Sequence, residues 1–262
     1  MNEKDFYTSV VQEFDTLLKY TIDVKIDILT LFPSMFEGPF DTSMLKKAKD
    51  KNLVEIHIHN LRDWATDKHK TVDSRPFGGG KGMVIRVDIV GRAIEKIKSQ
   101  KLKVKNTKNN SKIILLSPQG QLFSQEKARE LSKLDQVILI CGHYEGFDER
   151  IAENLVDEEI SIGDFVLTGG EIPAMVLADT IVRLIPGVLD EEATIHESFN
   201  QKSERSEKLL LDFPSYTRPE KYLGMQVPKV LLSGNHKEIE IWRKKAALTK
   251  TKKMRPDLTE LK

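Results

Sequence analysis

Cysteine is almost absent from this chain of 262 residues, because Cys141 is the only one. A single thiol excludes an intramolecular disulfide, and it excludes a zinc site built from several thiolates. No apolar run approaches the roughly 20 residues that a membrane-spanning helix needs. The first residues also lack the basic start and the apolar core of a secretory signal. We therefore expect a cytoplasmic protein with no membrane partner.

Two common nucleotide-binding signatures are also missing, although glycine gathers in one place. Gly78–Gly82 resembles a phosphate loop, but Lys81 is followed by glycine where the Walker pattern requires serine or threonine. The dinucleotide fingerprint G-x-G-x-x-G fails because Met83 and Ile85 occupy both possible final positions. A conventional Rossmann site is therefore disfavoured. The long segment Leu61–Gly82 has no period, which indicates either a flexible hinge or a functional loop.

Net charge gives little guidance, because 41 Lys and Arg residues nearly balance 40 acidic residues. The distribution is more informative. Lys96–Lys112 contains seven lysines and no acid, and Lys237–Lys262 contains nine basic residues against four acids. Gly187–Asp212 is acidic, with seven acids against three bases. Each run indicates a solvated face, and the basic C-terminal run is also consistent with a nucleic-acid contact.

Two continuous apolar runs are typical of parallel strands that are buried on both faces: Lys112–Leu116 and Val137–Cys141. Each run ends in a turn, Ser117–Gly120 after the first and Gly142–Gly146 after the second. The segment between them is helical in pattern, and Ser124 is suited to cap it. Strand, helix and strand in this order predict a right-handed parallel unit. Ligands collect at the carboxyl ends of such strands, so both turns point to one site.

A third glycine-marked turn follows further along the chain. Ile160–Leu167 is strand-like, but Gly163 interrupts it and Gly169-Gly170 ends it. A helix is then predicted from Glu171 to Ile185, with Arg183 on its last turn. Its expected inward-facing apolar stripe is Ile172, Met175, Val176 and Val182.

Further elements are predicted from the same patterns. Strands are expected at Lys25–Leu31 and Leu53–His59, and helices at Asp88–Ser99 and Ser233–Thr249. In the last helix Asn235 and Glu238 can form a capping box. The chain then divides into an extension (residues 1–24), an α/β domain (25–186), an acidic linker (187–206) and a C-terminal domain (207–262).

Nine motifs, in order and with matching spacing, carry a resemblance to a known family. They are IDILTLFPSMF (26–36), HKTVDSRPFGGGKGM (69–83), LLSPQGQ (115–121), ICGHYEGFDER (140–150), SIGDFVLTGGEIPAM (161–175), IVRLIPGVL (181–189), ESF (197–199), YTRPE (216–220) and LLSGNHKEIEIWR (231–243). Together they resemble the bacterial tRNA (guanine-N1)-methyltransferases, the TrmD family of the SPOUT superfamily. The resemblance covers the chain from about Lys25 to its end.

The resemblance implies a fold and an activity. The expected fold is a SPOUT-type α/β domain with a parallel sheet and a deep C-terminal trefoil knot, joined to a small all-α domain that binds tRNA. The expected assembly is a homodimer. The expected reaction moves the methyl group of S-adenosylmethionine to N1 of the guanosine at position 37 of tRNA, next to the anticodon.

The resemblance also assigns binding residues. His69, Asp73 and Arg75 are expected to handle the guanine. Three loops are expected to hold the cofactor, through Leu116, Ser117, Pro118, Gln119, Gly120, Gly142, His143, Tyr144, Glu145, Ile162, Gly163, Asp164, Phe165, Val166, Leu167, Gly169, Gly170 and Pro173.

Two residues are expected to be catalytic. Guanine N1 is a poor nucleophile until it loses its proton, so a carboxylate must take that proton. Negative charge then builds on O6, where the guanidinium expected at Arg183 can stabilise it. The family base is usually an aspartate before Ser-Phe, whereas this chain has Glu197 there. Glutamate has the same chemistry and reaches one methylene further.

Three questions stay open at this point. Family members use magnesium, for which Glu145 is the expected carboxylate, although spacing alone identifies no metal site. A SPOUT methyltransferase acting on another RNA would share the cofactor loops but not residues 69–76 or 216–220. A non-catalytic RNA-binding protein that keeps the fold would bind no cofactor.

Overall fold

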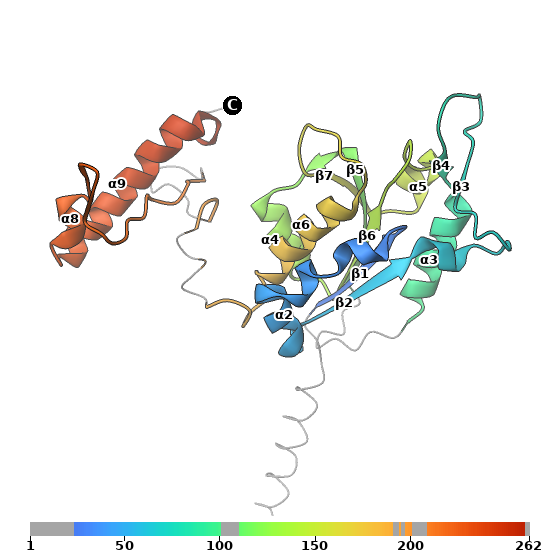
Figure 1. Ribbon diagram of the computed structural model, residues 1–262, viewed down its shortest axis with the longest axis horizontal. Coiled ribbons are helices and arrows are strands. Elements are labelled where there is room, and N and C mark those ends of the chain that lie inside the picture. Colours follow the sequence, from blue (N-terminus) through green and yellow to red (C-terminus); the bar gives the residue numbers. More distant parts are fainter. Residues whose placement is uncertain (1–23, 101–109, 191–193, 195–196, 201–208, 260–262) are drawn as a thin grey trace, which may run out of the picture. The chain divides into compact units, whose positions relative to one another are not determined.

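The computed structural model describes residues 24–100, 110–190, 194, 197–200 and 209–259 (Figure 1). The chain divides into two compact units, Met1–Val188 and Leu189–Lys262. The expected N-terminal extension, apart from Val24, lies outside the described residues, as do most of the lysine-rich run and much of the expected linker.

Five parallel strands form the central sheet of the first unit, in the order β2-β1-β6-β5-β7. The strands are β1 (Val24–Thr30), β2 (Val54–Asn60), β5 (Ser111–Leu122), β6 (Gln136–Cys141) and β7 (Glu158–Ser161). The predicted α/β fold with a parallel sheet is therefore confirmed. β5 and β6 are neighbours, and Ser124 accepts a hydrogen bond from the Lys127 amide (3.2 Å) at the start of the helix between them, as predicted.

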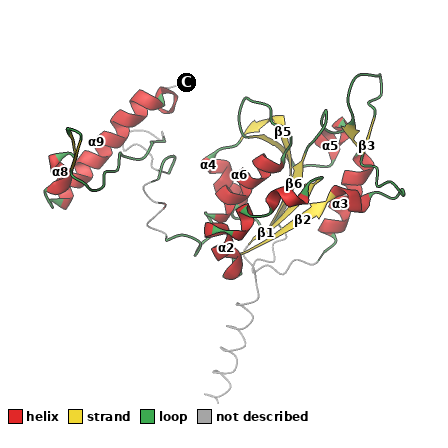
Figure 2. Ribbon diagram, viewed as in Figure 1, coloured by secondary structure: helices red, strands yellow, loops and turns green. Residues whose placement is uncertain are grey.

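Helices cover both faces of this sheet (Figure 2). One face carries α2 (Ser43–Asp50), α4 (Gln125–Leu131), α6 (Glu171–Val182) and the short 3-10 turns η1 (Pro33–Phe36) and η2 (Pro39–Asp41), while the other carries η3 (Leu61–Trp64), α3 (Val87–Lys98) and α5 (Glu149–Asn154).

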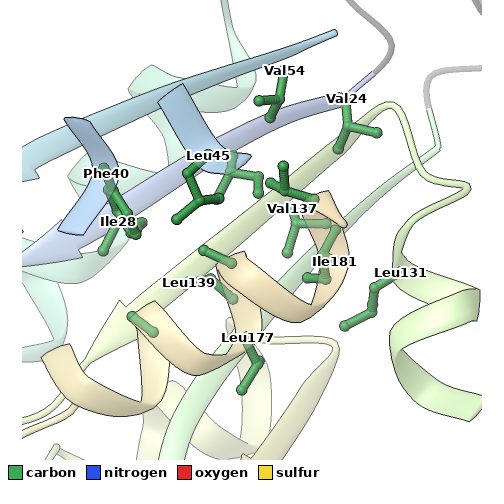
Figure 3. Packing of buried hydrophobic residues seen from close by; sticks show 14 of the residues in the cluster. Val24, Ile28, Phe40, Leu45, Val54, Leu131, Val137, Leu139, Leu177 and Ile181 are labelled. Atoms are coloured by element: carbon green, nitrogen blue, oxygen red, sulfur yellow. The ribbon is translucent and has the colours of Figure 1, made fainter. Parts of the chain in front are cut away.

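The two-sided cover explains why the strand sequences are apolar without interruption. Side chains alternate between faces, so Ile138 and Ile140 of β6 pack with α3, while Val137 and Leu139 pack with α6. Figure 3 shows Val137 and Leu139 in the same cluster as Ile181 of α6. Burial on both sides fixes β6 as the centre of the sheet.

The turn predicted at Ser117–Gly120 does not end its strand, which is a correction. Ile160 of β7 pairs both with Leu116 and with Gln121, so the four residues between them bulge out of β5 and the strand then resumes. A Cβ at Gly120 would lie 2.4 Å from the backbone of Glu159 and Ile160. Only glycine lets β5 rejoin β7 at this point. β7 itself ends at Ser161, six residues before the predicted strand end.

The predicted apolar stripe of α6 is also wrong in part. Ile172 and Val176 are 48% and 40% exposed, whereas Ala174, Leu177, Ala178 and Ile181 face the sheet and are fully buried. The helix is apolar on nearly every side, so hydrophobic periodicity could not select the buried face.

The second unit contains one long helix and an unpredicted hairpin. Its elements are β8 (Lys221–Tyr222), β9 (Met225–Gln226), α8 (Lys229–Leu232), α9 (His236–Met254) and the 3-10 turn η4 (Pro256–Leu258). The hairpin corrects the all-α expectation for this part of the chain. Leu223 and Gly224 both have positive φ, as a tight two-residue hairpin turn requires. Asn235 caps α9 by accepting from the Glu238 amide (3.3 Å), as predicted.

An extended segment packs along α9. The amide of Leu211 donates to the buried Thr251 hydroxyl (2.9 Å), and the Arg243 guanidinium lies 4.8 Å from the centre of the Phe213 ring. Tyr216 and Trp242 also meet, with 6.2 Å between ring centres. These contacts give the second unit its own small core.

Asp27 places a fully buried carboxylate in the centre of β1. Its Oδ1 lies 3.2 Å from the Lys25 ammonium and 2.7 Å from Nε2 of His59, and the Gln136 amide donates to its Oδ2 (2.6 Å). Burial alone would raise the pKa of Asp27. The hydrogen bonds and the Lys25 charge outweigh burial and lower the pKa below its usual value.

Asp27→Asn should therefore remove an acid-sensitive part of the stability. Because the folded-state pKa is lowered, the stabilisation is complete above the unfolded value of 3.8 and is lost as pH falls through the folded value. At neutral pH we expect a loss of roughly 3–5 kcal/mol, since the substitution leaves the buried Lys25 ammonium without its charged partner. Urea unfolding from pH 7 down to pH 3 measures this.

The difference between the two proteins should shrink below pH 4. Asp41→Asn is the matched control, because that carboxylate pairs with Lys49 (2.8 Å) at the surface and should change stability little. A difference for Asp27→Asn that stays constant across the whole pH range would contradict the role of its ionised form.

Candidate active site

Three loops meet at the carboxyl end of the sheet and surround a cavity of about 480 Å³. They are the bulge in β5, the loop after β6 and the loop between β7 and α6. Of the residues expected to hold a cofactor, the structure places these around the cavity: Leu116, Ser117, Pro118, Gln119, Gly142, His143, Tyr144, Glu145, Ile162, Gly163, Phe165, Val166, Leu167, Gly169, Gly170 and Pro173.

Two expected residues do not line the cavity. Gly120 lies against the backbone of β7, and Asp164 is exposed. The prediction also missed part of the wall: Leu115, Gly146, Phe147, Asp148, Glu149, Ala152, Glu159, Ile160, Ser161 and Thr168. Gly146 lies inside the turn predicted at Gly142–Gly146, although it was not among the expected cofactor residues. Most of the others flank the predicted turns, so wider turn boundaries would have found them, whereas Ala152 comes from α5 and carried no signal.

The glycines permit close approach of these loops. A Cβ at Gly170 would lie 2.6 Å from Cα of Cys141, and the Gly170 amide donates to the Gly142 carbonyl (2.9 Å). A Cβ at Gly163, whose φ is +154°, would lie 2.4 Å from the Phe165 ring. Substitution at either position would push one wall of the cavity outward.

A chain of buried polar groups lies beside the cavity. Glu171, fully buried at the start of α6, accepts a hydrogen bond from the Thr30 hydroxyl (2.6 Å) and lies 2.8 Å from Nε2 of His143.

The only cysteine, Cys141, is buried beside these groups. Burial, together with the charge of Glu171, raises the pKa of the Cys141 thiol well above its usual value. Cys141 is therefore a packed apolar side chain and not a nucleophile.

The segment expected to handle the substrate is attached to the cavity wall. Two short strands, β3 (Asp73–Ser74) and β4 (Val84–Ile85), form a hairpin whose tip holds the glycine-rich residues. The Ile85 amide donates to the Gly146 carbonyl, and the Glu145 amide donates to the Met83 carbonyl, both at 3.0 Å. The hairpin is thereby held against the loop that follows β6.

The three expected substrate residues all lie on this segment. Asp73 belongs to β3 and is half-buried, while His69 and Arg75 are exposed. The His69 amide donates to Asp67 (3.1 Å), which also accepts from the amide and the hydroxyl of Thr71. These bonds lower the pKa of Asp67 and give the loop a defined shape. Side chains that leave such a loop for solvent are available to a ligand.

The two expected catalytic residues belong to different units. Arg183 is the C-cap of α6 in the first unit, where its amide donates to the Asp179 carbonyl (3.1 Å). Glu197 belongs to the second unit, in a turn that the Asp212 amide fastens through the Ser198 hydroxyl (3.0 Å). In the same turn, the Phe199 amide donates to the Leu210 carbonyl (2.8 Å). Both side chains are partly exposed.

Among the described residues, no three His, Cys, Asp or Glu side chains converge as a metal site would require. Within these ranges the exposed Glu145, the residue expected to hold magnesium, belongs to no such group of three. In the same described ranges, no helix has the length and apolar character of a membrane span.

Comparison with known proteins shows the family to which the chain is related. A family model described as tRNA (Guanine-1)-methyltransferase TrmD matches residues 24–261. Two similar proteins, from Dictyoglomus turgidum and Carboxydothermus hydrogenoformans, are each 52% identical to this chain. The match covers 90% of this chain and 90% of the first relative, and 91% and 88% for the second.

A third relative, from Bacillus pumilus, is 51% identical over 90% of this chain and 92% of its own length. All three carry the name tRNA (guanine-N(1)-)-methyltransferase. Identity at this level over nearly the whole chain, together with the family match, establishes the relationship: the chain belongs to the tRNA (guanine-1)-methyltransferase family TrmD.

Proposed function

We propose that this chain transfers the methyl group of S-adenosylmethionine to N1 of the guanosine at position 37 of tRNA, next to the anticodon. The observation that carries the proposal is the cavity, because its wall is formed by loops of a chain about half identical to tRNA (guanine-N(1)-)-methyltransferases. The methylated nucleotide is the finer part of the proposal, and it follows from the family resemblance.

The residues present fit S-adenosylmethionine. The cavity volume of about 480 Å³ lies in the usual range for small-molecule sites, roughly 300–1,000 Å³. Glycines at 142, 163, 169 and 170 bring backbone donors and acceptors close to any occupant. When bound, this cofactor supplies an electrophilic methyl group, and the loops would hold it in line with the nucleophile.

The chain must then activate guanine. We assign proton removal from N1 to the Glu197 carboxylate and stabilisation of the charge on O6 to the Arg183 guanidinium. We assign orientation of the base to Asp73 and Arg75, because their hairpin is bonded to the cofactor loop through Glu145 and Ile85. A guanine bound by this hairpin would therefore be held close to the cofactor.

We further propose a homodimer in which α6 meets the partner subunit. Ile172 and Val176 on α6, together with Phe32 and Met35 at the adjoining η1, are exposed by 40–48%. A helix that is apolar all round is typical of burial on every side. A second copy would cover this outer face and enclose the site.

A knotted backbone is proposed for the cavity region. After β7 the chain returns to the end of β6, where the Gly170 amide donates to the Gly142 carbonyl, before α6 packs beside β6 and β1.

The second unit is proposed as the tRNA-binding domain, because α9 carries the basic residues of the C-terminal run. If magnesium takes part, Glu145 would hold it beside substrate oxygens, since Mg²⁺ often uses one or two carboxylates.

The function is tested with two tRNA transcripts that differ at one nucleotide. We expect methylation of the transcript with guanosine at positions 36 and 37, and none when adenosine replaces guanosine 37. Mass spectrometry of nuclease fragments locates the methyl group. A fragment of ribosomal RNA is the third substrate, and its preferential methylation would favour the other SPOUT activity. Absence of S-adenosylmethionine binding in calorimetry would favour the non-catalytic alternative.

A further inference from the structure

We propose that Glu171 is a positioning residue of the cofactor site, which fixes the ring of His143 and so holds two walls of the cavity together. The inference rests on the proposed function, because it concerns how this cavity keeps its shape for S-adenosylmethionine. Glu171 does not itself line the cavity, whereas His143, Gly169 and Gly170 do.

The position of Glu171 is unusual for a carboxylate. It is fully buried, and an acid is rarely found in such a place without specific partners. Both of its oxygens have one, and the two partners come from different parts of the sheet. Oε1 accepts from the Thr30 hydroxyl at the end of β1 (2.6 Å), and Oε2 meets Nε2 of His143 after β6 (2.8 Å).

The hydrogen bonds converge on the Glu171 carboxylate from two sides. The Phe32 amide donates to the Thr30 oxygen (2.9 Å), so the single hydroxyl hydrogen of Thr30 is free to point at Glu171. An ionised carboxylate only accepts, so Nε2 of His143 must carry the hydrogen of the second bond. The Phe32 ring packs on the imidazole with 4.6 Å between centres. The His143 ring is thus held by a hydrogen bond at Nε2 and by a tilted ring contact with Phe32.

The neighbouring glycine shows what the pair does for the cavity. A Cβ at Gly169 would lie 2.2 Å from Nε2 of His143 and 2.5 Å from Oε2 of Glu171. The two side-chain ends are hydrogen-bonded to each other and cannot move aside freely. The turn before α6 therefore rests directly on the His143–Glu171 pair, and the pair sets the spacing between this turn and the loop after β6.

Glu171→Leu, which keeps the size but removes both bonds, should weaken S-adenosylmethionine binding roughly 10- to 100-fold. The variant Glu171→Gln should recover most of the affinity, because the amide can accept from Thr30 and donate to the other tautomer of His143. Calorimetry measures both values. Glu95→Leu, at an exposed glutamate of α3, is the control and should bind like the wild type.

A spectroscopic readout separates positioning from a general loss of stability. Long-range ¹H–¹⁵N spectra report the imidazole tautomer, and the chain has six histidines, so His143 is assignable with a His143→Ala variant. We expect hydrogen on Nε2 in the wild type and on Nδ1 in Glu171→Gln. The same tautomer in both proteins would overturn the proposal.

A double variant tests the proposal even if each single variant is somewhat destabilised. His143→Ala and Glu171→Leu break the same link, so their effects should not add. The affinity of the double variant for S-adenosylmethionine should lie within about threefold of that of the weaker single variant. Fully additive losses would overturn the proposal. Wild-type protein that binds no S-adenosylmethionine would instead refute the proposed function and leave the hydrogen-bond geometry untouched.

Discussion

Replacing Glu197 by glutamine should lower the rate of methyl transfer by roughly 10²–10⁴-fold, the usual contribution of a general base. S-adenosylmethionine binding should not change, because the cofactor loops all belong to the other unit of the chain. Glutamine keeps the size and hydrogen-bonding shape of the side chain but cannot take the proton from guanine N1. Single-turnover methylation of a tRNA transcript, beside calorimetry with the cofactor, measures the two effects separately.

The pH dependence makes the assignment sharper. Without a base, transfer depends on guanine that has already lost its N1 proton, so the rate of Glu197→Gln should rise steadily with pH. Glu197→Asp, the residue usual in the family, should keep most of the activity. Asp190→Asn changes an exposed acid of the same acidic stretch and is the matched control. If the Asp190 and Glu197 variants behaved alike, Glu197 would be an ordinary surface acid.

Arg183→Lys should lower the transfer rate by roughly 10²–10³-fold, the cost of removing a donor that stabilises a developing oxyanion. Lysine keeps the positive charge at the C-terminal end of α6, so the stability of the helix should change little. Lysine cannot present two parallel N–H groups to guanine, as a guanidinium can. The maximal rate should therefore fall much more than the affinity for S-adenosylmethionine.

Thermal unfolding checks the stability of Arg183→Lys, and calorimetry checks its affinity for S-adenosylmethionine. Arg92→Lys on α3, where the arginine pairs with Asp88 (3.0 Å), is the control for a general sensitivity to arginine replacement. A rate within threefold of the wild type would remove Arg183 from the mechanism. A proportional loss of cofactor affinity would assign Arg183 to binding instead.

Much of the first unit follows from short-range sequence signals. The apolar runs before Ser117 and Gly142 predicted parallel strands, and the structure pairs them as β5 and β6. Ser124 and Asn235 predicted helix caps that the hydrogen bonds confirm. Such signals act within a few residues, where side-chain and backbone chemistry decide the local conformation.

Other features depend on contacts that no local pattern encodes. The bond between Thr30 and Glu171 joins residues 141 positions apart, so nothing near either residue indicates it. The outward side of α6 could not be assigned, because Ile172 and Val176 are as apolar as the buried side. The resemblance, rather than any pattern, singled out Arg183 and Glu197, since an arginine at a helix end and an acid in an acidic stretch are common.

The bulge in β5 constrains how this cavity can evolve. Because the strand rejoins the same neighbour at Ile160 after four residues, the detour is clamped by backbone hydrogen bonds at both ends. Adding or deleting one residue would turn every later side chain of β5 to the opposite face. Ordinary surface loops can change in length, whereas the length of this bulge is fixed by the alternation of side chains along β5. On this side of the cavity, new specificity in descendants of this chain must therefore arise by exchanging side chains on a segment of constant length.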